Sequence, residues 1–481
     1  MTFNSLIFAA FLPIVFCLYW FVFNRNLKWQ NAFVVVASYV FYGWWDWKFL
    51  ILIAITSFCS WGSGLLIERF KDERKKAKWI SAANIILNLG ILGLFKYYDF
   101  FAQSFADLFL DGKADGVLLH LILPVGISFY TFQALSYSID VYRGKIEPTR
   151  DIIQFFAYVS FFPQLVAGPI ERATNLLPQF GRERTFDYSQ AVDGLRQMLW
   201  GYFKKIVIAD WCAIYVDEVF GDIPGHAGVP LIGAAILFAF QIYGDFSGYS
   251  DIAIGTSKLF GIKLMRNFAT PYFSRDIAEF WRRWHISLTT WFRDYLYIPL
   301  GGSRCSKAKI VRNTFVIFLV SGLWHGANWT FVAWGAFHAL LFLPLILTGN
   351  NRKYRDVVAP DRFLPSLKEI GQILLTFGLV TIGWVIFRAD TLPQAWEYIS
   401  GMVKWKSPAD ALFFVSPVFL TRAVWIAILV FVEWFDRQRE HGLTMSGIRY
   451  RAVRYAIYFV IALVLILYFD DGSPKFIYFQ F

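Results

Sequence analysis

Two of the six histidines, His285 and His325, stand among residues that could take part in proton transfer. His325 belongs to a Trp-His-Gly triplet inside a run of 36 residues, Thr314 to Gly349, that holds no charged side chain. If this run crosses a membrane, an ionisable ring within it is costly to keep and is a candidate functional residue. A neutral imidazole there could accept a proton from a hydroxyl group as a general base. The alternative is a buried histidine that a backbone carbonyl satisfies.

His285 lies in the segment Phe280–Asp294, FWRRWHISLTTWFRD, which interleaves arginines with tryptophans. This mixture is typical of an interfacial helix, because aromatic rings favour the headgroup level and arginines reach lipid phosphates. Alternatively, Arg282 and Arg283 attract a polyanionic donor or a carrier protein at the cytoplasmic face. The spacing alone does not choose between membrane anchoring and donor binding.

Four further residues are candidates for contact with a substrate or donor. Asp245 and Asp251 lie in Gln241–Gly255, QIYGDFSGYSDIAIG, where an expected membrane span ends. Carboxylates in this position can orient a histidine, line a pore or cap helices. Trp324 and Asn328 flank His325 closely and are included for that reason.

The absence of several sequence motifs excludes the classes of enzyme that depend on them. The sequence has no P-loop, GxSxG elbow, HExxH or dinucleotide fingerprint. Its four cysteines show no ligand-like spacing, so we expect neither a disulfide framework nor a metal site. Any energy for a reaction must therefore arrive already stored in a substrate, and we expect no bound cofactor.

The composition places these residues in a membrane. Apolar residues make up 57% of the 481-residue chain, aromatic residues 20% and charged residues only 17%, far from a soluble protein. The net charge of +11 is explained by basic loops on the cytoplasmic side of a membrane protein, so we expect no nucleic-acid partner. We therefore expect a polytopic membrane protein in contact with lipid.

Crossing about 30 Å of hydrocarbon takes roughly twenty apolar residues in a helix. The segments of this kind are Leu6–Phe23, Asn31–Trp45, Phe49–Ile67, Trp79–Phe95, Val117–Ile139, Ile152–Ile170, Ile206–Phe220, Val229–Gly244, Thr314–His325, Trp329–Gly349, Ile370–Phe387, Ala411–Val432 and Tyr455–Phe469. They predict an all-α polytopic fold of about 11–13 crossings with added re-entrant or interfacial helices.

Two of these segments should be broken. Pro163, Gly168 and Pro169 interrupt Ile152–Ile170, which favours a re-entrant or interfacial segment. The uncharged run around His325 would cover about 54 Å as one helix, too long for one crossing. We expect a break around residues 326–328, which puts His325 at a helix end. The basic loops, among them Glu68–Lys78, are expected in the cytoplasm and both termini outside.

Several blocks along the chain resemble a known family. They are PVGISFYTFQALSYSIDVYRG (Pro124–Gly144), FFPQLVAGPIER (Phe161–Arg172), QIYGDFSGYSDIAIG, FWRRWHISLTTWFRDYLYIPLGG, GLWHGANWTFVAWG and the ending FIYFQF. Their content and order are similar to the membrane-bound O-acyltransferases, in the branch of the alginate O-acetyltransferases. The resemblance implies a single domain over residues 1–481, with core motifs in 124–338 and peripheral spans in 1–100 and 366–481.

The resemblance also implies an activity. Such enzymes carry an acyl group from a cytoplasmic thioester, here acetyl-CoA, to a hydroxyl at or beyond the outer face. It assigns catalysis to His325 and to the second signature histidine, His285, and implies a funnel or tunnel that joins the two sides. It further implies the inner membrane of a bacterium, an extracytoplasmic partner with a serine hydrolase-like site, and a polysaccharide acceptor such as alginate.

Two alternatives remain open at this point. In the teichoic-acid branch of the same family the donor is a D-alanyl carrier protein, whose docking would also use a basic cytoplasmic face. A transporter or flippase for a polar lipid-linked sugar would also use broken helices and buried Asp or His residues.

Overall fold

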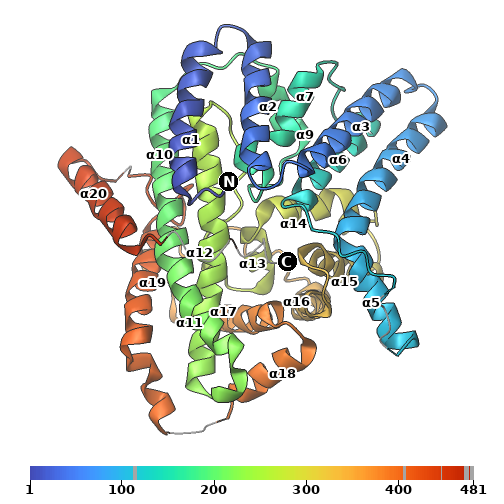
Figure 1. Cartoon of the computed structure of the whole chain (residues 1–481). Coiled ribbons are helices and arrows are strands. Elements are labelled where there is room, and N and C mark those ends of the chain that lie inside the picture. Colours follow the sequence, from blue (N-terminus) through green and yellow to red (C-terminus); the bar gives the residue numbers. More distant parts are fainter. Residues whose placement is uncertain (112–115, 405–407, 446, 471–475, 477–481) are drawn as a thin grey trace. The chain divides into compact units, whose positions relative to one another are not determined.

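The computed structural model describes residues 1–111, 116–404, 408–445, 447–470 and 476. Every regular element in these ranges is a helix, which confirms the expected all-α class (Figure 1). Seven described helices are long and apolar enough to cross a membrane: Phe49–Arg69, Arg74–Phe109, Val229–Leu259, Trp329–Leu347, Leu367–Arg388, Pro417–Phe435 and Arg451–Tyr468. The total of about 11–13 crossings and the funnel remain predictions.

The chain divides into two compact units. Unit 1 contains Met1–Leu195 and Ala253–Met265, and unit 2 contains Arg196–Ile252 and Arg266–Phe481. Two helices contribute residues to both units, α10 (Tyr188–Tyr202) and α12 (Val229–Leu259). The assignment of residues 1–481 to a single domain stays a prediction.

The described residues of unit 1 form nine further α-helices. They are α1 (Leu6–Cys17), α2 (Leu27–Gly43), α3 (Phe49–Arg69), α4 (Arg74–Leu92), α5 (Tyr98–Phe109), α6 (Ile127–Tyr142), α7 (Ile152–Ser160), α8 (Phe162–Leu165) and α9 (Ala173–Phe180). The π-helical stretch after α1, Leu18–Val22, holds the segment Ala253–Met265, because the Trp20 indole N–H donates to the Leu259 carbonyl at 2.9 Å. The Tyr19 hydroxyl donates to the neighbouring carbonyl of Phe260 at the same distance.

One expected span of unit 1 is wrong at its start, and one expected break is confirmed. The helix predicted from Val117 begins only at Ile127, after Gly126 with φ +74°. A Cβ at Gly126 would lie 2.6 Å from a backbone oxygen, so this left-handed position requires glycine. The broken segment Ile152–Ile170 forms two helices, because α7 ends at Ser160 and the four-residue α8 follows.

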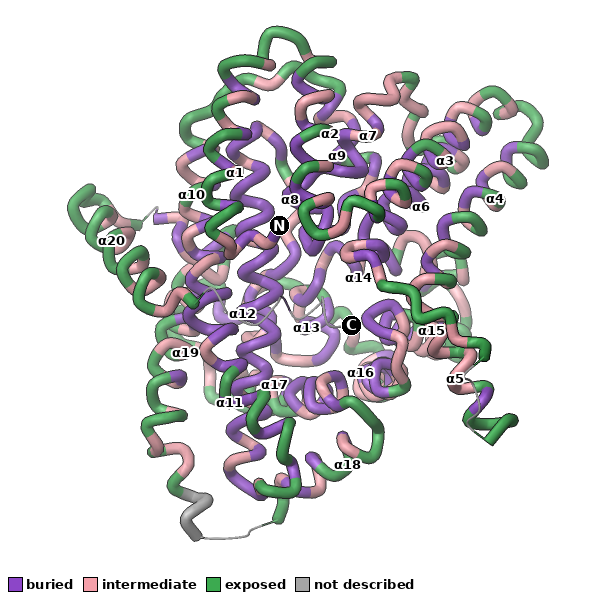
Figure 2. Tube along the Cα trace, viewed as in Figure 1, coloured by how far each residue is buried: buried purple, intermediate pink, exposed green. Residues whose placement is uncertain are grey.

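Unit 2 holds the remaining helices. They are α11 (Trp211–Gly221), α13 (Ile277–Arg283), α14 (Ile286–Phe292), α15 (Lys307–His325), α16 (Trp329–Leu347), α17 (Leu367–Arg388), α18 (Leu392–Gly401), α19 (Pro417–Phe435) and α20 (Arg451–Tyr468). Figure 2 shows α12 mostly buried and α20 mostly exposed. The apolar surface of α20 is what a helix facing lipid presents.

The predicted end of one span at Gly244 is wrong, because α12 continues to Leu259 with Asp245 and Asp251 inside it. The two carboxylates are neutralised by lysines of a π-helical stretch, Phe203–Asp210, that joins α10 to α11. Lys205 Nζ lies 2.7 Å from Asp245, and Lys204 Nζ lies 2.5 Å from Asp251. A helix can keep charged side chains in a protein interior only when they are paired in this way.

The hairpin of α15 and α16 confirms the predicted break. Helix α15 ends at His325 and α16 begins at Trp329, so the uncharged run forms two helices. The helices approach closely through Gly322 and Gly335. A Cβ at either glycine would lie 2.2–2.3 Å from a backbone oxygen of the other helix. Small residues at such a crossing allow two backbones to pack directly against each other.

Candidate active site

His325 is the last residue of α15 and its side chain is buried, with 4% of its surface exposed. Gly326 follows because a Cβ there would lie 2.0 Å from the ring of Phe331. Asn328 then caps α16: its Oδ1 accepts from the Thr330 N–H at 3.0 Å. Its Nδ2 donates to a backbone carbonyl at the start of α18, that of Asp390, at 2.8 Å. Asn328 therefore fixes the turn after His325 on both sides.

His285 occupies a second interruption, between α13 and α14. Its backbone is left-handed, with φ +45°, and its side chain is 1% exposed. Neither ring nitrogen has a hydrogen-bond partner among the described residues. Burial lowers the pKa of His285 to about 3, because a charged imidazolium is poorly solvated there. The ring is therefore neutral at physiological pH.

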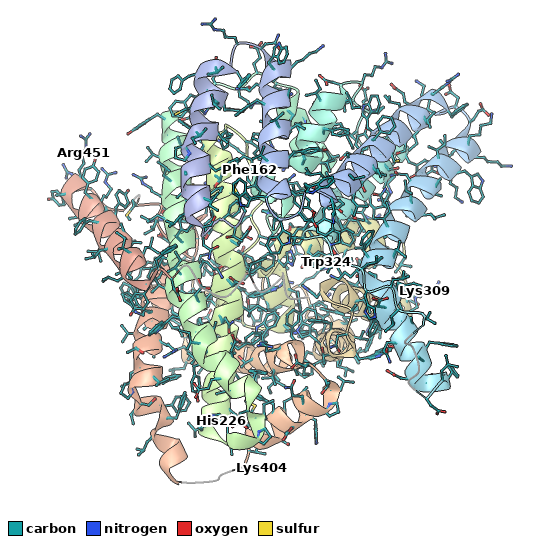
Figure 3. All side chains as sticks on the ribbon, in the orientation of Figure 1. Phe162, His226, Lys309, Trp324, Lys404 and Arg451 are labelled. Carbon is teal, nitrogen blue, oxygen red and sulfur yellow. The ribbon has the colours of Figure 1, made fainter. Side chains whose placement is uncertain are left out.

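The structure brings the two histidines together from positions 40 residues apart in sequence. Their ring centroids are 6.2 Å apart. Trp324, labelled in Figure 3, contacts both rings, at 5.7 Å from His285 and 5.0 Å from His325. Phe246 of α12 lies edge-on to His285 at 4.6 Å. The two imidazoles thus lie close together among aromatic side chains.

Two further aromatic rings, which the sequence did not single out, pack against His325. Trp334 of α16 lies 5.1 Å from the His325 ring, and Phe387 of α17 lies 5.4 Å from it. With aromatics at 20% of the chain, no local pattern distinguishes these two from the other rings. The contacts of Trp334 and Phe387 with His325 depend on the packing of α15, α16 and α17.

The distance between the rings bears on what they could share. An oxygen that hydrogen-bonds to an imidazole nitrogen lies about 4 Å from the ring centroid. A centroid separation of 6.2 Å is therefore short enough for one oxygen to bond both imidazoles when a nitrogen of each ring points to it.

The two arginines of the candidate donor site bind protein groups. The Arg283 guanidinium donates to Glu279, a buried carboxylate, at 2.9 Å and to the Asp356 carbonyl at 3.0 Å. Arg282 is exposed and donates to the carbonyls of Asn351, at 3.0 Å, and of Tyr354. Both arginines thus fasten residues 351–356 to α13. A contact of either arginine with a donor stays a prediction.

The interpretation of this segment as an interfacial helix is wrong for its tryptophans. Trp281, Trp284 and Trp291 are all buried in the protein and do not lie at a headgroup surface. Their rings pack on other aromatic side chains, as Trp284 does on Trp384 at 4.8 Å. The segment is therefore a broken pair of helices inside unit 2.

The aspartates lie in ion pairs on α12. Lys205 joins Asp245 to Asp210, at 2.7 Å from each. Asp251 accepts from Lys204 and from the Gln197 amide, the latter at 2.8 Å. The doublet Lys204-Lys205 before an apolar run was the one signal of these partners in the sequence. The contact of α12 with His285 runs through Phe246, the neighbour of Asp245.

Comparison with known proteins decides the family. Residues 145–353 match the model of the membrane-bound O-acyltransferase family, and both histidines lie in this range. The chain is 42% identical over 404 residues to the probable alginate O-acetylase AlgI of Pseudomonas aeruginosa, covering 84% of this chain and 75% of the relative. The chain belongs to the membrane-bound O-acyltransferase family. It is therefore an acyl-transferring enzyme of the membrane.

Other members of the family are similar to this acyltransferase over most of its length. The peptidoglycan O-acetyltransferase of Helicobacter pylori is 36% identical over 430 residues, covering 83% of this chain and 79% of the relative. The teichoic acid D-alanyltransferase of Bacillus subtilis is 26% identical over 356 residues, covering 70% and 85%. Of the ending FIYFQF, residues 477–481 lie outside the described part. Phe476 packs on Tyr249 of α12 at 4.5 Å.

Proposed function

We propose that this acyltransferase moves an acetyl group from acetyl-CoA, bound from the cytoplasm, to a hydroxyl group, and so supports O-acetylation of an extracytoplasmic polysaccharide such as alginate. The observation that carries the proposal is the pair of buried imidazoles, His285 and His325, with ring centroids 6.2 Å apart. The relatives named as O-acetyltransferases support the acetyl group, since they match the chain at higher identity than the D-alanyltransferases do.

In this mechanism His325 is the general base. It takes the proton of the acceptor hydroxyl while the hydroxyl oxygen attacks the thioester carbonyl carbon. A C–O bond forms, and the tetrahedral intermediate then expels the sulfur by breaking the C–S bond. The proton passes from the His325 imidazolium to the leaving thiolate, which departs as the thiol of CoA. General-base help of this kind contributes roughly 10²–10⁴-fold in rate.

His285 stabilises the negative oxygen of that intermediate. It is neutral, because burial holds its pKa at about 3, so one ring nitrogen carries a proton to donate. A positioned donor of this kind is worth roughly 10²–10³-fold in kcat. The low dielectric of the buried site strengthens the interaction.

The test uses purified protein and acetyl-CoA labelled in the acetyl group, with release of free thiol as the readout. His325→Ala should lower the rate about 10²–10⁴-fold, whereas His226→Ala should stay within about twofold. His226 is a suitable control because its ring lies in a loop, where Nδ1 is 2.8 Å from the Asp222 carbonyl. Wild-type thiol release by folded His325→Ala would remove the assigned base. Sugar transport without label transfer would favour the flippase.

The same assay separates the donors when a D-alanyl carrier protein replaces acetyl-CoA. Transfer from the carrier protein alone would show that the enzyme transfers D-alanyl groups and not acetyl groups.

We propose that the enzyme lies in the inner membrane of a bacterium with both termini outside. A separate serine hydrolase-like protein would then pass the acetyl group to the polymer. In vesicles with labelled acetyl-CoA on the cytoplasmic side, label should reach an outer polymer only when that partner is added.

A further inference from the structure

Two backbone hydrogen bonds enclose the interruption that carries His285. The N–H of Ala269 donates to the carbonyl of Arg283 at 3.0 Å, and the N–H of Ile286 donates to the carbonyl of Asn267 at 2.9 Å. Residues 267–269 thus run alongside residues 283–286 in unit 2. Only Trp284 and His285 lie between the two bonds, so the position of the His285 backbone is set from outside its own helices.

The backbone at this place is strained. His285 has φ +45°, and Thr270, the residue after Ala269, has φ +47°. Positive φ is uncommon for any residue but glycine, and for a β-branched residue such as threonine it is a genuine outlier. Such conformations persist only when the surrounding structure over-determines them. Some group near His285 must supply that constraint.

The side chain of Asn267 supplies it. This residue is fully buried, and its Oδ1 accepts from the Ser287 hydroxyl at 2.9 Å and from the Ser287 N–H at 3.4 Å. Its Nδ2 donates to the Ser250 hydroxyl of α12 at 3.1 Å. Backbone and side chain of one asparagine therefore hold both residues that follow His285.

Helix α12 fixes the ring and the backbone of His285 from the same face. Phe246 and Ser250 are four residues apart, so they lie one turn apart on that face. Phe246 contacts the His285 ring edge-on at 4.6 Å, while Ser250 holds Asn267. An asparagine suits the second task because it offers an acceptor and a donor on one planar group. Leucine has neither, and aspartate has no donor when ionised.

We propose that Asn267 is a positioning residue for His285: it fixes the left-handed backbone that aims the imidazole at His325. The inference rests on the proposed function, in which His285 stabilises the reaction's oxyanion. Asn267 acts through its hydrogen bonds to residues 286 and 287, which follow His285.

The first test is Asn267→Leu, which keeps the volume and removes the side-chain hydrogen bonds. We expect kcat to fall about 10–100-fold, since a misplacement of about 1 Å costs up to 10²-fold, with the KM for acetyl-CoA within about twofold. Asn313→Leu is the matched control. Asn313 is also fully buried in unit 2 and donates to the Leu300 carbonyl at 3.1 Å, so its loss should lower the melting temperature with kcat within about twofold.

A double-mutant cycle with His285→Ala separates positioning from general damage. If Asn267 acts through His285, Asn267→Leu should add less than about twofold to the loss once the imidazole is gone. An equal loss of kcat in the presence and absence of His285 would overturn the inference. So would a wild-type kcat for folded Asn267→Leu.

A milder variant covers the case in which Asn267→Leu does not fold. Ser287→Ala removes the 2.9 Å bond to Oδ1 and should lower kcat about 3–10-fold, again only when His285 is present. No loss in Ser287→Ala would then overturn the inference. Failure of the proposed function looks different: His285→Ala would itself keep wild-type kcat. If His285→Ala is inactive and the Asn267 and Ser287 variants are active, only the positioning role is wrong.

Discussion

Gly326→Ala should displace His325 without changing any polar group. The added Cβ would lie 2.0 Å from the Phe331 ring, about 1.4 Å short of the 3.4 Å at which ordinary contact begins. Phe331 has little room to move, since it is buried and packs on Phe387 at 4.8 Å, and Phe387 in turn packs on His325. Overpacking of this kind costs about 1–3 kcal/mol. A shift of about 1 Å at the base would lower kcat by up to about 10²-fold.

Thiol release from acetyl-CoA and the melting temperature in detergent together measure both effects. Gly378→Ala is the control, because a Cβ there meets nothing within 4 Å in α17, and it should not lower either quantity. Trimming the obstructing ring in Gly326→Ala/Phe331→Leu should return part of the activity. The reasoning fails if Gly326→Ala alone keeps its kcat within twofold and melts with the wild type, or if the double variant is worse than the single one.

Three further predictions concern stability, measured as melting temperature in detergent. Lys205→Met leaves Asp210 and Asp245 buried without their shared cation and should lower the free energy of unfolding by about 3–5 kcal/mol. Changing both aspartates to Asn in that variant should largely restore the stability. An unchanged melting temperature for Lys205→Met would contradict this prediction. Burial raises the pKa of Glu171 to about 7, so the folded state binds the extra proton, and stability should fall as pH rises from about 4.5 to 7. Glu171→Gln should flatten that slope, and an unaltered slope would assign it to another group. Asn328→Ala should cost about 0.5–2 kcal/mol by removing the N-cap of α16, whereas Asn328→Ser keeps a side-chain acceptor and should lose less.

The break at His325 was predictable from the sequence because it follows from length. A single helix over the uncharged run would be far longer than a bilayer, and Gly326 and Asn328 supply a close approach and a cap at the point where the run must turn. The structure confirms the break within the expected three residues. A feature that depends only on the length of a segment and on neighbouring residues can be predicted from the sequence in this way.

The extent of α12 was not predictable, because its charges are cancelled by residues far away in sequence. Asp245 and Asp251 mark the end of a span when each is considered with its neighbours alone. Lys204 and Lys205, about 40 residues earlier, neutralise the two carboxylates through ion pairs of 2.5–2.7 Å and so lower the free-energy cost of burying them. Pairing partners of buried charges are set by tertiary packing, which hydropathy does not record.

The resemblance to a family named both His285 and His325, but the proximity of the two rings was not predicted. Nothing in the local pattern around His285 predicts its left-handed backbone, since Asn267 and Ser250, which hold it, belong to other segments. The arginines next to it illustrate the same limit. Their charge suggested a donor site, and the structure shows them bound to carbonyls of residues 351–356.

The burial of His285 also bears on which imidazole acts as the base and which as the hydrogen-bond donor. A general base is most effective when its pKa lies near the working pH. With its pKa lowered to about 3 by burial, the neutral His285 ring rarely binds a second proton at pH 7 and is a poor proton acceptor. The same burial makes it a dependable neutral N–H donor, which is what a developing oxyanion requires. In the proposed mechanism His285 is therefore the hydrogen-bond donor and His325 the base, so kcat should show no ionisation of His285 between pH 5 and 9.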